Sequence, residues 1–274
     1  ALCLDAGGRL PLSTPVGEIW VRCEPKLARR TLEDLLRHRS GLRPWTPLYL
    51  RCHRRQEVER LLLDGELLGA SAGTYSDLGY ILWGLAAERV LGRTPDELLR
   101  EFLLEPLGED GLRTTPVEAA DAMRCELDTR REVELASAEG LELEPLSPPR
   151  SGSVQDGNTR FLGGYTGHAG LFSTPEALWR LVQEWLSPGG LLSAAAVRRA
   201  LTGGRTFACG WERRRVKKSA GPALSRGSFG HIGFTGGSCW VDPQRDRVFV
   251  LLAHRTRELP NLDRWRRRFH GLEF

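Results

Sequence analysis

Two short segments of the sequence carry side chains that can donate and accept protons. Tyr75 and Asp77 stand at the N-terminal edge of a segment with helical periodicity, and His231 stands in a Gly-rich segment that is expected to form a strand. Tyrosine, aspartate and histidine are residue types that act as general acids and bases. Each also has a structural interpretation: a half-buried tyrosine with a wet hydroxyl, an aspartate that favours the helix dipole, or a hydrogen-bonded core histidine. The residues alone leave both interpretations open.

The glycines around His231 favour a functional interpretation of that segment. They are Gly230, Gly233, Gly236 and Gly237. Glycine within a strand indicates that another group approaches the backbone closely. His168, a lone histidine among small residues, is interpreted as structural, and Leu171-Phe172 beside it are expected to wall a cleft.

The elements that must position these residues come as helices first and strands later. Helices are predicted over 31–38, 75–91, 94–104, 174–185, 193–201 and 261–270, most of them behind a Ser or Thr cap. Strands are predicted over 206–212, 230–234, 237–242 and 248–253, joined as antiparallel hairpins. Because no β-α-β alternation occurs, the prediction is an α+β fold. We expect one domain over 1–274, with a helical region at roughly 31–201 and a strand meander at roughly 206–253.

Four segments resemble successive landmarks of the class C β-lactamase-like serine hydrolases, a family of class C β-lactamases, D-alanyl-D-alanine peptidases and related esterases. Three are LLRHRSGL at 35–42, YSDLGY at 75–80 and GHIGFTGGSCWVDP at 230–243. The fourth is LGGYTGHAGLFST at 162–174, shortly after VQDGNT at 154–159. Their order and spacing together are specific, and the resemblance runs from Ala1 to about His270.

The resemblance implies an antiparallel sheet flanked by helices, a helical region, and an active site between them. Acyl transfer by a serine needs a base beside the hydroxyl, an electropositive neighbour and two N–H donors for the oxyanion. The family meets this need with Ser-x-x-Lys, Tyr-x-Asn, and Lys-Thr-Gly or His-x-Gly. The second and third motifs match 75–77 and 231–233, so the resemblance implies that Tyr75, Asp77 and His231 are catalytic. It also implies that Gly233 and Phe234 form the oxyanion and substrate strand, with the Phe234 N–H as a donor.

Asp77 departs from the asparagine of the family motif. In a site, its charge would keep a neighbouring lysine protonated and would oppose formation of a tyrosinate.

The first motif of the family is absent from the printed sequence. The chain has three lysines, Lys26, Lys217 and Lys218, and none has a serine three positions before it. Cys23 stands three positions before Lys26, but Pro25 and a loop-like setting oppose a catalytic helix there. We therefore expect Ser-x-x-Lys to lie upstream of Ala1, in a fold that is truncated at its N-terminus, and the chain as printed to be inactive.

The implied reaction is hydrolysis of a small-molecule ester, amide or β-lactam through an acyl-serine intermediate, without metal or organic cofactor. The histidine of the third motif favours an esterase-like member over a true β-lactamase. A non-catalytic pseudo-hydrolase that only binds is the alternative, because Ser-x-x-Lys is missing and Asp77 replaces asparagine.

Composition and net charge argue against other classes of protein, such as nucleic-acid-binding and membrane-spanning proteins. The chain has 274 residues, 41% hydrophobic and 27% charged, which is typical of a folded domain. The net charge of +4 demands no polyanionic partner, and the arginine clusters are interpreted as solvated faces, so no nucleic-acid binding is predicted. No stretch approaches the ~20 apolar residues of a membrane span. The six cysteines lack C-x-x-C spacing and are interpreted as free or buried thiols, which slightly favours a reducing, cytoplasmic compartment.

Overall fold

The computed structural model describes residues 1–108, 110–114, 117–123, 130–143, 149–255, 259 and 261–272. Cys125 therefore lies outside the described residues.

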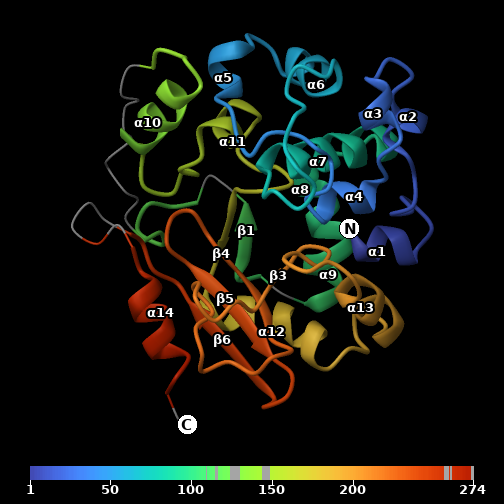
Figure 1. Ribbon diagram of the computed structural model, residues 1–274. Helices are drawn as coiled ribbons and strands as arrows, with labels where there is room; N and C mark the ends of the chain where they lie inside the picture. The colour runs from blue at the N-terminus through green and yellow to red at the C-terminus, as the bar shows by residue number, and fades with distance from the viewer. Residues whose placement is uncertain are drawn as a thin grey trace.

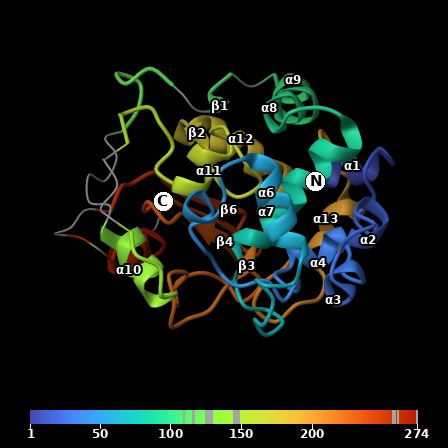
Figure 2. The same ribbon diagram turned by 90° about the horizontal axis from the view of Figure 1, so that it is seen from above.

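The N-terminal part of the chain folds into short helices around one long helix, α7 (Asp77–Leu91). The others are α1 (Leu2–Ala6), α2 (Val16–Ile19), α3 (Pro25–Ala28), α4 (Leu32–Leu36), α5 (Leu48–Arg51), α6 (Arg55–Leu63), α8 (Pro95–Leu99), a π-helical turn η1 (Arg100–Leu104) and α9 (Glu105–Leu107). Figure 1 shows this helical region above the sheet, and Figure 2 shows the same region from above. Its leucine-rich core packs α4, α6 and α2 against α7.

Helix α7 begins and ends where its sequence requires. Ser76 caps its N-terminus by accepting the Gly79 N–H at 3.3 Å, and its own hydroxyl donates to the Arg43 carbonyl at 2.6 Å. Gly92 ends the helix in the left-handed conformation at φ 63°, which costs glycine little. The helix therefore starts at Asp77, directly after the Tyr75-Ser76 pair.

The C-terminal part contains a four-stranded antiparallel sheet in the order β3-β4-β5-β6. The strands are β3 (Glu212–Arg213), β4 (Phe229–Ile232), β5 (Ser238–Asp242) and β6 (Arg247–Leu251). In the β4–β5 register His231 is opposite Cys239. Helix α12 (Pro175–Leu186) packs on β5 and β6, while α14 (Asp263–Phe269) reaches the sheet through Phe269, 5.8 Å from Phe249 between ring centroids.

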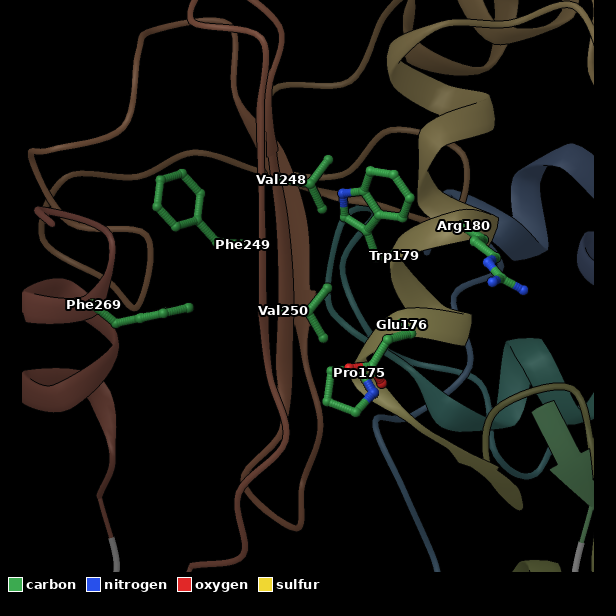
Figure 3. Close-up of a pocket in the computed structure, with 8 residues that line it drawn as sticks. All are labelled: Pro175, Glu176, Trp179, Arg180, Val248, Phe249, Val250 and Phe269. Carbon is green, nitrogen blue, oxygen red and sulfur yellow. The ribbon is translucent and has the colours of Figure 1, made fainter. Parts of the chain in front are cut away.

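Alternation along β6 explains how the sheet faces two helices. In Figure 3, Val248 and Val250 lie on the α12 side, whereas Phe249 lies on the side of Phe269. Successive strand residues point to opposite faces, so the strand has apolar side chains for both layers. A groove of about 420 Å³ follows β6 between these helices, and Trp179, 48% exposed, lines it. This groove is lined by neither Tyr75 nor His231.

The α+β prediction is confirmed, with three differences in detail. The expected helical region also contains a small two-stranded antiparallel sheet of β1 (Leu112–Thr114) and β2 (Leu171–Ser173). The strand expected over 206–212 is reduced to β3 and a bridge between Phe207 and Glu212. Strand β4 ends at Ile232, so Gly233 and Phe234 follow the strand instead of belonging to it.

The remaining helices are α10 (Arg130–Ala138), α11 (Gly157–Phe161) and α13 (Ala194–Leu201). Asp156 caps α11 by accepting the Thr159 N–H at 2.7 Å. No helix among the described residues is long and apolar enough to cross a membrane.

Candidate active site

The structure brings Tyr75 and His231 together, although one precedes α7 and the other lies in β4. Their ring centroids are 5.8 Å apart. The Tyr75 hydroxyl donates to Asp77 Oδ1 at 2.7 Å, so the carboxylate belongs to the same cluster. The three predicted catalytic side chains therefore meet where the helical region faces the sheet.

Tyr75 and Asp77 influence each other's protonation. Burial and the Asp77 carboxylate raise the pKa of Tyr75 above its ordinary value, which keeps the phenol protonated. Burial also raises the pKa of Asp77, while His168, Tyr75 and His231 act in the opposite direction. Tyr75 as a residue remains 40% exposed, so the pair faces a space that a ligand can reach.

His231 is half-buried, and its ring is held by the backbone carbonyl of the next residue. Its Nδ1 lies 2.9 Å from the Ile232 carbonyl oxygen, which can only accept, so Nδ1 carries the proton. In the neutral ring Nε2 is then the acceptor. This tautomer gives the cluster a nitrogen lone pair, the group needed to take a proton or a hydrogen bond.

Gly233 and Phe234 lie in the turn from β4 to β5. The Gly233 N–H donates to the Gly237 carbonyl at 2.7 Å and is thereby used within the turn. The Phe234 N–H has no acceptor within the described part of the chain. The Phe234 ring is 51% exposed, with the Arg255 guanidinium 3.7 Å from its centroid. Of the two, Phe234 is therefore the residue whose N–H is available to a ligand.

Two of the glycines around His231 have a structural explanation. A methyl group at Gly230 would overlap the Cys239 carbonyl and the Trp240 ring, and one at Gly236 would lie 2.7 Å from the Ala253 oxygen. At Gly230 and Gly236, the groups that approach the glycine backbone closely therefore come from neighbouring strands and loops of the protein. Gly233 meets only ordinary contacts, the nearest at 3.6 Å.

Sequence reasoning missed His38 as a member of the cluster. Its ring lies 4.7 Å from Tyr75 and 4.5 Å from Phe207 between centroids, and its Nδ1 accepts the Ser76 N–H at 3.0 Å. Burial, followed by His231, lowers the pKa of His38 to about 4, so this ring is neutral at pH 7. The motif LLRHRSGL contained it, but its place under Tyr75 depends on tertiary packing.

His168 is buried, as its structural interpretation predicts, and it is also paired with a carboxylate. Its Nε2 lies 3.2 Å from Asp156 Oδ1, with the His168 side chain 6% exposed. Burial alone would lower the pKa of His168, but Asp156 and Asp77 together raise it above its ordinary value.

Cys23 and Lys26 do not form a nucleophile and base pair. The setting expected to be loop-like contains the short helix α3, which starts at Pro25 because proline is tolerated at a first helical position. Cys23 precedes this helix, and burial, together with Glu24, raises the pKa of its thiol to about 11. The thiol is therefore not a thiolate at neutral pH.

No group of three or more metal-ligating side chains occurs among the residues that the structure describes. The arginine clusters include ion pairs to acidic side chains, for example Arg55 with Glu88 and Arg215 with Glu212.

Known proteins provide independent comparisons. The Beta-lactamase family model matches residues 1–272. The chain is 27% identical over 245 residues to the N-acetylmuramyl-L-alanine amidase of Bacillus subtilis, covering 81% of this chain and 55% of that protein. It is 27% identical over 281 residues to Esterase/beta-lactamase LipL of Mycobacterium tuberculosis, covering 90% of this chain and 64% of LipL. The chain thus spans about half to two thirds of the length of these relatives.

A solved structure shows the same fold. The β-lactamase from a Sulfitobacter species superposes with a TM-score of 0.70 at 19% identity, covering 98% of this chain and 78% of that chain. The similarity includes both the helical region and the sheet. Since the family model extends over nearly the whole sequence, the chain belongs to the β-lactamase family of hydrolases.

Proposed function

We propose that the protein hydrolyses a small-molecule ester, amide or β-lactam through an acyl-serine intermediate, with Tyr75, Asp77 and His231 in its active site. An esterase-like activity is preferred, because the third motif carries His231 in place of lysine. The observation that carries the proposal is the meeting of Tyr75, bonded to Asp77, with His231 across the interface of two regions.

In this reaction a serine oxygen attacks the carbonyl carbon, the alcohol or amine leaves with a proton, and water releases the acid. Tyr75 and the free Nε2 of His231 support the proton transfers, because both can exchange a proton with a neighbouring oxygen. The Phe234 N–H supplies one donor to the oxyanion, and the serine N–H would supply the second. The raised pKa of Tyr75 favours a neutral phenol that donates and accepts over a tyrosinate base.

The second candidate function is binding without turnover. The printed sequence contains no Ser-x-x-Lys, and Asp77 stands where the family motif has asparagine. Such a pseudo-hydrolase would bind the same ligands at the same residues.

A fluorophosphonate probe and a chromogenic acetyl ester distinguish these functions. We expect the chain as printed to be neither labelled nor active, because it lacks the nucleophile motif. If the gene encodes Ser-x-x-Lys in frame, the longer chain should be labelled at that serine and should hydrolyse the ester. A longer chain with the motif but no labelling would support binding alone, and labelling of the printed chain would contradict the missing-nucleophile hypothesis.

Substitutions then test the residues. In the active form, Tyr75→Phe and His231→Ala should each lower kcat/KM by ~10²-fold or more, while Asp77→Asn should be milder. Tyr49→Phe is the matched control, because its hydroxyl bonds to Glu132 at 2.9 Å, outside the cluster. Wild-type rates in both Tyr75→Phe and His231→Ala would remove the site assignment.

A further inference from the structure

A buried arginine joins helix α14 to the turn that contains Phe234. Arg266 is only 5% exposed. Its Nη2 donates to the Gly236 carbonyl in the turn between β4 and β5, and its Nη1 donates to Asp263 Oδ1 at 3.0 Å. A guanidinium presents its donors in a rigid, planar fork, so these two bonds fix its orientation. Arg266 thus connects a helix at the end of the chain with the turn that follows His231.

Two groups that come after β6 in the chain hold this turn. The Arg255 N–H donates to the Thr235 carbonyl at 2.6 Å, and the Arg266 guanidinium donates to the Gly236 carbonyl. These are the carbonyls of the two residues directly after Phe234. The backbone on the C-terminal side of the Phe234 N–H is therefore bonded to groups outside the turn.

The conformation of Gly236 shows why the turn depends on its contact with α14. Its φ of 134° is rarely adopted by residues with a Cβ, and its N–H donates to the Gly233 carbonyl at 3.1 Å. A methyl group at Gly236 would lie 3.0 Å from Leu262 Cδ1, at the start of α14. Packing therefore prevents the turn from moving toward α14, while the bond from Arg266 opposes movement away from it.

We propose that Arg266 is a positioning residue of the candidate site: by bonding to the Gly236 carbonyl, it fixes the turn between β4 and β5 and with it the direction of the Phe234 N–H. Its effect on turnover rests on the proposed function, in which that N–H is an oxyanion donor. Such a donor is most effective when it already points at the position where charge develops, because no reorganisation is then needed during the reaction. Arg266 acts through the turn and not on the substrate.

The test compares two substitutions in α14. Arg266→Met keeps an unbranched side chain but removes every donor, and Arg264→Met is the matched control at an exposed position of the same helix. In the printed chain, nitrogen-15 relaxation should give the Phe234 amide an order parameter of about 0.85 in the wild type and in Arg264→Met, falling toward about 0.6 in Arg266→Met. The amides of β4 and β5 should keep their wild-type values in both variants.

An arginine that only attaches α14 to the sheet would lower stability without changing the turn. A folded Arg266→Met with a wild-type order parameter and a wild-type N–H residual dipolar coupling at Phe234 would therefore overturn the proposal. If Arg266→Met does not fold, the wild type decides through the scalar coupling across the bond from Arg266 Nη2 to the Gly236 carbonyl carbon. Absence of this coupling, where the couplings between β4 and β5 are observed, would also overturn it.

The role in turnover is measured in the active form that contains Ser-x-x-Lys. Arg266→Met should lower kcat by about tenfold or more and leave KM within about twofold, because an oxyanion donor acts mainly on the transition state. Arg264→Met should leave both constants unchanged. An effect of Arg266→Met on KM alone would contradict the positioning role. The NMR measurements need neither a nucleophile nor a substrate, so their outcome is independent of whether the hydrolase proposal fails.

Discussion

The side chains of His38 and His168 are both largely buried, yet their surroundings favour opposite protonation states. His38 is 4% exposed and lies among the rings of Tyr75, Tyr80 and Phe207. Its Nδ1 accepts a backbone N–H. His168 instead has a carboxylate at one nitrogen and a hydroxyl at the other. Burial disfavours the cation in both, and only His168 has an anion that outweighs it.

This difference shows how the helical side of the site is organised. His38 supports Tyr75 through ring packing and a bond to the next residue, so it needs to be neutral. His168 is paired with the Asp156 carboxylate, which raises the pKa of the imidazole and favours its protonated form. Burial alone therefore does not predict the protonation state of either histidine. The hydrogen-bond partner at each ring nitrogen decides it.

The largest expected effect on stability comes from breaking the Asp156–His168 pair. Asp156→Asn should lower the free energy of unfolding by about 3 kcal/mol, because it leaves a buried imidazolium without its anion while asparagine still caps α11. Urea unfolding at pH 6 measures the change. Glu134→Gln is the control, since its pair with Arg131 is exposed and should contribute less than about 0.5 kcal/mol. Equal small effects in both variants would contradict a buried, charged His168.

For His38, the neutral histidine, we expect a loss of folding stability of intermediate size at acid pH. The pKa of His38 is lowered to about 4, so its contribution to stability is complete above pH 6.5 and is lost as pH falls through 4. Between pH 7 and pH 4.5 this loss amounts to about 2 kcal/mol. Urea unfolding of the wild type and His38→Gln at both pH values isolates it, because the variant lacks the titrating ring. Parallel losses in the two proteins would show that His38 is not the cause.

The smallest expected effect concerns His168. Its contribution to stability is lost at alkaline pH, whereas that of His38 is lost at acid pH. The pKa of His168 is raised, so its contribution is complete below the unfolded pKa and is lost as pH rises through the folded pKa. From pH 6 to pH 9 the wild type should therefore lose more stability than His168→Gln. The same unfolding measurement compares them, and a greater loss in the variant would mean that His168 is neutral at pH 6.

Much of the architecture could be predicted from local sequence. The cap and periodicity of 75–91 predicted α7 with its first residue two positions early, and the alternating segments predicted β4, β5 and β6 within a few residues. The two-stranded β1–β2 sheet was missed, because its two short strands come from distant segments and carry little pattern of their own. The strand expected over 206–212 failed for a related reason: Phe207 pairs with Glu212 in a turn-like bridge, so little of the segment pairs with β4.

The candidate site divides in the same way. The family resemblance carried by the sequence motifs predicted that Tyr75, Asp77 and His231 work together, and the sequence by itself determined that Ser-x-x-Lys is missing from the printed chain. Only the tertiary structure decided that His38 lies under Tyr75, that the Gly233 N–H is used within its turn, and that His168 is paired with Asp156. The physical reason is that a side chain's protonation and free hydrogen-bonding groups depend on its neighbours in space, and these neighbours come from segments far apart in the sequence.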